Sequence, residues 1–329
     1  MNSPESPNGS TTPELITIGR VSIDLYPQQT GPMKSVTTLR KSIGGTATNV
    51  AVATARLGHR AALVTKVGDD AFGLDIRNAL TERFGVDSSY VSTHPTLPTP
   101  LAFAELDPVE EPSIIFYRYP DAPDFQLEEA DLVDVPVEDT GILWIPASRF
   151  AAEPSRTAVM KVLERRQRKS HTVFDLDWRP GFWNSEAEAN KIIEPLIDQF
   201  TIVIGNRQEC KVAVGTDDPH DAADRLLARG LNAAVVKLGG DGVLVANADG
   251  TRSEVAPFPV EVVCGLGAGD AFGGAFCHGL LSDWTIEECV RYGNAAGAIV
   301  AARLLCADDM PFVHEIDEFL AARTGQGEA

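Results

Sequence analysis

Short apolar runs that alternate with amphipathic segments constrain the fold of this chain more than any other feature. Runs with the length and β-branched content of buried strands lie at 14–27, 61–68, 141–147, 171–177, 200–206, 232–239 and 242–248. Segments with apolar residues at helical spacing lie between most of them, for example at 47–59, 70–86, 155–168 and 186–198. Such alternation predicts an α/β fold, a mostly parallel sheet with helices on both faces. The first run is expected to end at a polar turn near Asp24.

Two segments do not follow this alternation of strand-like and helix-like stretches. Residues 25–43 and 97–120 lack helical periodicity and alternate instead between apolar and polar residues. We expect them to pair as a small separate β-sheet that forms a lid over the strand ends, where open α/β sheets bind ligands. The expected organisation is one domain over 14–323, with a disordered arm at 1–13 and a disordered tail at 324–329.

The charge balance restricts the partners of the chain. Its 329 residues carry a net charge of −19, which argues against nucleic acid and anionic membrane surfaces. An anionic ligand would need cations placed locally against this field. The five cysteines show no CxxC spacing, so they are expected to be reduced thiols. With neither a leader-like start nor an apolar run of about 20 residues, a cytoplasmic location is expected.

The stretch 262–276, VVCGLGAGDAFGGAF, holds five glycines around one acid. Its spacing fails the dinucleotide fingerprint, and the Gly-Lys-Ser/Thr of a phosphate-binding loop is absent. The N–H groups of Gly267, Ala268 and Gly269 can instead hold charge on a transferred phosphoryl group. Asp270, one turn into the helix, can accept the proton of an attacking hydroxyl. An ordinary helix start with a first-turn aspartate explains the stretch equally well.

A second motif, IGGTATN, precedes the first predicted helix. Gly44 and Gly45 allow a polyol to lie against the backbone, and the Asn49 amide can both donate and accept hydrogen bonds. Asp24 is a candidate acceptor of sugar hydroxyls. A turn followed by a capped helix fits the same residues.

Two further motifs suit a nucleotide. Asn206 and Glu209 lie three apart after a predicted strand, where oxygen ligands can hold Mg²⁺ directly or through water. A helix N-cap with a first-turn glutamate is the alternative. Lys237, Gly239 and Gly242 form a predicted hairpin whose backbone can lie along a nucleotide, or a plain β-turn.

The segment FDLDWRPGFW holds two acids and an arginine at a predicted strand end. Asp175, Asp177 and Arg179 are therefore expected to reach the site beyond the sheet. Arg179, with Arg118 on the predicted lid, can bind a carboxylate in the bidentate manner that lysine cannot match. Pairing of each arginine with neighbouring acids is the alternative in a chain this acidic.

The order of these motifs resembles the ribokinase-like (PfkB) carbohydrate kinases over about residues 14–320. IGGTATN, GNRQE, KLGGDG, GAGDAFGGAF and YGNAAGAIVA follow one another as they do in that family. The resemblance implies a Rossmann-like α/β domain with a β lid that often makes a homodimer contact. The implied activity is ATP- and Mg²⁺-dependent phosphorylation of a sugar hydroxyl.

The resemblance also implies roles for single residues. Asp270 matches the catalytic base, and the residues from Gly267 match the anion hole. Asn206 and Glu209 match the Mg²⁺ and phosphate motif. The positions that match ATP-binding residues are Lys237, Gly239, Gly242 and Asn294, and those that match sugar-binding residues are Asp24, Gly44, Gly45 and Asn49.

Members of this family that act on sugar acids carry arginines at positions like Arg118 and Arg179, which favours a sugar acid over a neutral sugar as the acceptor. Residues 264–266 depart from the family's Asp-Thr-Thr, so a monovalent cation is not implied. The alternatives are a kinase of neutral sugars and a non-catalytic ligand-sensing regulator on the same scaffold; the failed glycine spacing disfavours a dehydrogenase.

Overall fold

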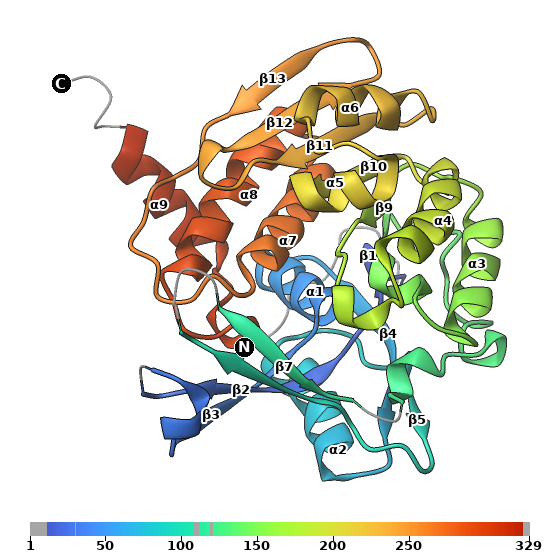
Figure 1. Ribbon diagram of the computed structural model, residues 1–329, viewed down its shortest axis with the longest axis vertical. Coiled ribbons are helices and arrows are strands. Elements are labelled where there is room, and N and C mark those ends of the chain that lie inside the picture. Colours follow the sequence, from blue (N-terminus) through green and yellow to red (C-terminus); the bar gives the residue numbers. More distant parts are fainter. Residues whose placement is uncertain (1–11, 30, 108–111, 119–120, 325–329) are drawn as a thin grey trace.

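The computed structural model describes residues 12–29, 31–107, 112–118 and 121–324 (Figure 1). The predicted disordered arm and tail therefore fall almost wholly outside the described residues. All five cysteines are buried and free of disulfides. Among the described helices, none has the length and apolar character needed to cross a bilayer.

A nine-stranded sheet forms the centre of the molecule, in the order β13-β12-β11-β10-β9-β8-β1-β4-β5. The strands from β11 to β5 run parallel, whereas β12 and β13 are antiparallel at one edge. This confirms the predicted mostly parallel sheet. The strands are β1 (Leu15–Ile18), β4 (Ala61–Gly68), β5 (Val91–His94), β8 (Ile142–Pro146), β9 (Thr172–Asp175), β10 (Ile202–Asn206), β11 (Ala233–Lys237), β12 (Val243–Asn247) and β13 (Arg252–Val255).

Helices cover both faces of this sheet (Figure 1). One face packs against α1 (Thr46–Arg56), α2 (Ala71–Asn78), α7 (Ala268–Leu281), α8 (Ile286–Ala301) and α9 (Val313–Thr324). The other packs against α3 (Ser155–Arg166), α4 (Glu186–Leu196), α5 (Arg207–Val214) and α6 (Pro219–Leu227). Neighbouring strand residues such as Leu143 and Trp144 enter opposite core clusters, since strand side chains alternate between faces. Apolar runs without alternation were therefore the correct sign of a sheet buried on both sides.

A second, four-stranded sheet stands apart from the first, in the order β3-β2-β6-β7. β2 and β6 run parallel, and each also pairs with an antiparallel outer strand. The expected small sheet is thus present: β3, β6 and β7 lie in the two segments without helical periodicity, whereas β2 begins in the first apolar run. Its strands are β2 (Ser22–Pro27), β3 (Leu39–Gly44), β6 (Leu101–Glu105) and β7 (Ser113–Tyr117).

The prediction of a single strand over 14–27 is wrong. The run is divided at Gly19–Val21: β1 belongs to the large sheet and β2 to the small one. A Cβ on Gly19 would lie 2.6 Å from the Cβ of Ala47, so the chain passes close to α1 at this point. Asp24 accordingly lies within β2, not in a turn. The division carries the chain from the large sheet directly into the small one.

Candidate active site

Two cavities lie beyond the carboxyl ends of the parallel strands. The inner cavity, about 60 Å³, lies beside the small sheet and is lined by residues that include Arg20, Asp24, Asn49, Arg179 and Asp270. The outer cavity, about 480 Å³, is lined by residues that include Lys237, Gly239, Gly242, Gly269 and Asn294. This edge of the sheet is where open α/β folds bind ligands.

The start of α7 separates the two cavities. Gly267 and Asp270 line the inner cavity, whereas Ala268 and Gly269 line the outer one. Gly267 is the N-cap residue with φ of +80°, and a Cβ there would lie 2.6 Å from Sγ of Cys306. Only glycine meets both demands. The positive end of a 14-residue helix therefore lies between the two cavities.

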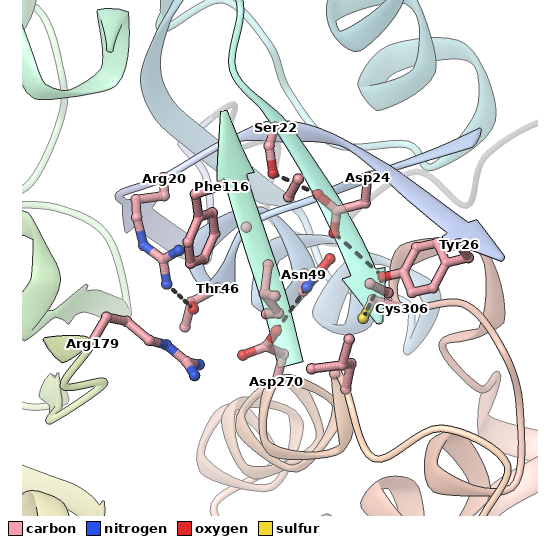
Figure 2. A pocket seen from close by; sticks show the side chains of 16 residues that line it. Arg20, Ser22, Asp24, Tyr26, Thr46, Asn49, Phe116, Arg179, Asp270 and Cys306 are labelled. Atoms are coloured by element: carbon pink, nitrogen blue, oxygen red, sulfur yellow. Dashed lines mark hydrogen bonds between the residues drawn. The ribbon is translucent and has the colours of Figure 1, made fainter. Parts of the chain in front are cut away.

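Asp270 is held by one hydrogen bond. Nδ2 of Asn49, on α1, donates to Oδ2 of Asp270 at 2.7 Å (Figure 2). Burial raises the pKa of Asp270 to about 6, although the Asn49 hydrogen bond lowers it. Oδ1 of Asn49 is buried and has no hydrogen-bond partner among the described residues. The inner cavity thus offers a carboxylate with a pKa near neutrality beside an unused acceptor oxygen.

Asp24 lines the same cavity from β2. It accepts hydrogen bonds from Oγ of Ser22 at 2.6 Å and from the hydroxyl of Tyr26 at 3.3 Å. Burial raises its pKa to about 6 as well. A Cβ on Gly44 would overlap the Asp24 side chain, and one on Gly45 would lie 2.4 Å from the carbonyl oxygen of Arg20. The two glycines therefore make room for Asp24 and Arg20, and Gly45 itself lines the cavity.

Arginines form the opposite side of the inner cavity. Nε of Arg179 donates to Oδ1 of Asp177 at 2.8 Å, and its guanidinium group points toward Asp270 (Figure 2). Nη2 of Arg20 donates to Oδ2 of the same Asp177 at 2.8 Å. Burial by itself would raise the pKa of Asp177, but the two arginines lower it well below its usual range.

Arg118 lies elsewhere. Its Nη2 donates to Oδ1 of Asp124 at 2.5 Å, and both side chains are almost completely buried. The guanidinium group also lies over the rings of Phe125 and Phe182. Arg118 is not among the residues that line the inner cavity. The structure therefore brings Arg179, but not Arg118, to the cavity.

The outer cavity brings together four of the predicted positions, Lys237, Gly239, Gly242 and Asn294. Gly242 has φ of +100°, and a Cβ there would lie 2.3 Å from the carbonyl oxygen of Val255. Nδ2 of Asn294 donates to the carbonyl oxygen of Ala256 at 3.0 Å. Burial lowers the pKa of Lys237. The nearby carboxylates, chiefly those of Glu209 and Asp175, together raise this pKa by a larger amount, so it lies above its usual value. Lys237 therefore carries its positive charge next to the start of α7.

Asn206 and Glu209 form a capping box at the start of α5. Oδ1 of Asn206 accepts from the amide of Glu209 at 2.9 Å, and Oε2 of Glu209 accepts from the amide of Asn206 at 2.7 Å. Oε1 of Glu209 makes no hydrogen bond among the described residues. Mg²⁺ keeps several waters and needs only one or two protein carboxylates beside phosphates. The donor set therefore fits a hydrated Mg²⁺ in addition to its capping role.

Arg20 is a cavity residue that the sequence motifs did not predict. It lines the inner cavity and is 4% exposed, yet it was counted within an apolar run and assigned to a buried strand. The signal was present, because an arginine inside a buried strand is rare unless a partner or a ligand neutralises it. Ser22, Tyr26, Thr46 and Cys306 also line this cavity and were not singled out.

Fold and geometry together define a class of protein. An open α/β sheet with two cavities on either side of one helix N-terminus, one of them lined by a carboxylate, is the arrangement expected of an enzyme that brings two small ligands together. The sequence profile of the pfkB family of carbohydrate kinases matches residues 12–312, and the chain belongs to this family. The resemblance inferred from motif order is confirmed.

Relatives across the whole chain agree with this. A 5-dehydro-2-deoxygluconokinase of Clostridium botulinum is 32% identical over 325 residues, which covers 95% of this chain and 94% of the relative. The enzyme of the same name from Geobacillus thermodenitrificans is 32% identical over 314 residues, 93% of each chain. A putative ribokinase II from E. coli, solved in complex with ATP and Mg²⁺, superposes with a TM-score of 0.82 at 22% identity, covering 94% and 99% of the chains.

Proposed function

We propose that this carbohydrate kinase transfers the γ-phosphoryl group of ATP to the terminal hydroxyl of 5-dehydro-2-deoxy-D-gluconate. The substrate assignment is supported by the names of the relatives that align over almost the whole chain. One observation carries the chemistry: Asp270, held by Asn49, stands at the helix start that separates the two cavities. The inner cavity takes the acceptor and the outer cavity takes the nucleotide.

Proton removal and charge stabilisation are divided between side chain and backbone in this proposal. Asp270 accepts the proton of the attacking hydroxyl, for which a pKa of about 6 is suitable near neutral pH. The backbone N–H groups of residues 267–270 and the positive end of α7 hold the charge on the phosphoryl group. Lys237 lies beside Gly269 and adds a positive charge on the nucleotide side.

The acceptor is proposed to bind through Asp24, Asn49 and the backbone at Gly44 and Gly45. Oδ1 of Asn49 is buried without a partner, and a sugar hydroxyl would satisfy it. Asp24 accepts from a second hydroxyl. The small sheet closes over the bound sugar acid and excludes water, which would otherwise take the phosphate.

Arg179 is proposed to contact the carboxylate of the sugar acid. It lines the inner cavity, and its guanidinium nitrogens other than Nε make no hydrogen bond among the described residues. Arg118 is not proposed for this contact, because Asp124 already neutralises it in a buried pair. Recognition of an acid disfavours the neutral sugars ribose and fructose, while 2-dehydro-3-deoxygluconate stays the nearest alternative acceptor.

Asn206 and Glu209 are proposed to hold a hydrated Mg²⁺, which when bound would neutralise charge on the nucleotide phosphates. No requirement for a monovalent cation is proposed. A homodimer is proposed through the small sheet, whose strands expose the apolar side chains of Leu39, Ile115 and Tyr117.

The activity is tested by ADP release with ATP and Mg²⁺ over a panel of acceptors. The panel contains 5-dehydro-2-deoxygluconate, 2-dehydro-3-deoxygluconate, ribose and fructose. We expect the highest kcat/KM for the first. A higher value for ribose or fructose would contradict the sugar-acid assignment, and ADP release that no acceptor stimulates would contradict kinase activity altogether.

A further inference from the structure

Two arginines of the inner cavity share one carboxylate. Asp177 accepts from Arg20 through Oδ2 and from Arg179 through Oδ1, each at 2.8 Å. Asp177 also accepts from Oγ of Ser148 at 2.7 Å and is 3% exposed. Because one carboxylate is only a few ångströms wide, it fixes the two guanidinium groups side by side on the same wall of the cavity.

Arg20 is built into this wall. Its Nε donates to Oγ of Ser148 at 3.2 Å, and its Nη2 donates to Oγ1 of Thr46 at 2.8 Å as well as to Asp177. The ring of Phe182 lies 5.2 Å from the guanidinium carbon. Among the described residues, Nη1 makes no hydrogen bond. The hydrogen bonds of Nε and Nη2 therefore fix the orientation of the Arg20 guanidinium group, and Nη1 is left without a partner among the described residues.

Asp177 does not use all the donors of the two arginines. The two guanidinium groups share its single carboxylate, and the other carboxylates that line the cavity belong to Asp24 and Asp270. Arg149, next to Ser148 in the chain, is fully buried, and none of its guanidinium nitrogens has a hydrogen-bond partner among the described residues. On the cavity wall, the guanidinium nitrogens of Arg20 and Arg179 that Asp177 leaves unused are donors that an anionic group of a ligand can accept from.

We propose that Arg20 and Arg179 jointly bind the carboxylate of the acceptor, through the guanidinium nitrogens that Asp177 leaves unused. Arg20 thus takes the role that motif comparison assigned to Arg118. Asp177 is a positioning residue that holds both arginines in place. The carboxylate end of the acceptor then lies at the arginine wall, and its far hydroxyl faces Asp270. This inference rests on the proposed sugar-acid kinase activity.

The test compares two acceptors with one variant. The acceptors are the sugar acid and its neutral analogue in which CH₂OH replaces the carboxylate. For Arg20→Gln we expect KM for the sugar acid to rise about 30-fold or more, as for loss of one partner of a buried charged hydrogen bond. KM for the neutral analogue and for ATP should change less than about twofold, since the analogue lacks the charge that Arg20 binds and ATP does not contact Arg20.

Two further variants keep the test decisive. Arg20→Lys retains the charge without the planar fork and should lie between the parent and Arg20→Gln in KM for the acid. It also replaces Arg20→Gln if that variant does not fold, as judged by melting with and without ATP. Arg225→Gln removes an exposed arginine that pairs with Asp221 on α6 and serves as the matched control.

The outcomes are distinct. Equal rises in KM for the acid and its neutral analogue would overturn the inference, because Arg20 would then act only on the shape of the cavity. A rise in KM for ATP alone would also overturn it and would assign Arg20 to the nucleotide phosphates. If the parent phosphorylates only neutral sugars, the proposed function fails before Arg20 is tested.

Discussion

The inner and outer cavities lie on either side of the same helix start, but they are built differently. The outer cavity uses backbone at Gly239, Gly242 and Gly269, together with one charged side chain, Lys237. The inner cavity uses charged side chains from segments far apart in the chain, among them Arg20, Asp24, Arg179 and Asp270. Backbone recognises phosphates in general, whereas side chains in a fixed arrangement select one acceptor. We therefore expect the inner cavity to determine which acceptor this chain selects.

The largest expected effect belongs to Asp270. Asp270→Asn removes the proton acceptor and leaves the N–H groups of α7 in place, so kcat should fall about 10³-fold or more. Coupled ADP release measures this loss, and the shift in melting temperature on addition of ATP should persist. If ATP binding were lost together with turnover, the separation of the two cavities would be wrong.

A variant of Arg179 tests whether the inner cavity binds the acceptor and not ATP. Arg179→Ala should raise KM for the sugar acid about 30-fold, because a charge-assisted contact with the carboxylate is removed. KM for ATP should stay within about twofold. Steady-state kinetics with each substrate varied in turn measures the two KM values. Arg225→Gln is again the control, because Arg225 lies outside both cavities. Equal losses for both substrates would place Arg179 at the transferred phosphate.

The two cavities also differ in how far the sequence predicts them. Residues 237–242 and 267–270 are continuous motifs, so the proposed nucleotide side and the proposed catalytic helix start were each predicted from one short stretch. The arginine wall depends on tertiary structure. Arg20 was missed because an apolar run that crosses from one sheet into another keeps the same pattern, and only the close approach of Gly19 to α1 reveals the break.

Arg118 is the converse case: the sequence suggested it for the cavity, but the structure places it elsewhere. Its partner, Asp124, lies only six residues further along the chain, and the pair is buried beside Phe125. An arginine that pairs locally and one that faces a ligand look alike in a charge pattern. Of the two arginines that the motifs suggested, only Arg179 lines the cavity. The parallel sheet and the second sheet, by contrast, followed from periodicity alone.

Lys237 tests the outer cavity and should have a smaller effect. Lys237→Met removes one positive charge from a nucleotide site that keeps its backbone contacts, so KM for ATP should rise about tenfold. KM for the sugar acid should be almost unchanged. Lys211→Met, on the exposed side of α5, is the control. A larger effect on the acceptor than on ATP would reverse the assignment of the cavities.

The last prediction concerns stability, because the two cavities differ in whether burial of their charged side chains destabilises the fold. Burial raises the pKa of Asp270 from 3.8 to about 6, so the folded state binds this proton more tightly than the unfolded state. The ionised carboxylate therefore destabilises the fold above pH 6, and the penalty disappears as the pH falls from 6 toward 3.8. Lys237 of the outer cavity carries no such penalty, since neighbouring carboxylates raise its pKa.

Asp270→Asn should consequently be more stable than the parent at pH 8, by at most about 3 kcal/mol in the free energy of unfolding. This difference should shrink steadily below pH 6 and be nearly absent at pH 4. Thermal melts of both proteins between pH 4 and 8 measure it. Asp249→Asn is the control, because hydrogen bonds from Thr251 lower the pKa of that exposed carboxylate and its removal should give no gain at pH 8. A gain for Asp270→Asn that did not vary with pH would arise from packing, and the inner cavity would then hold its carboxylate without electrostatic cost.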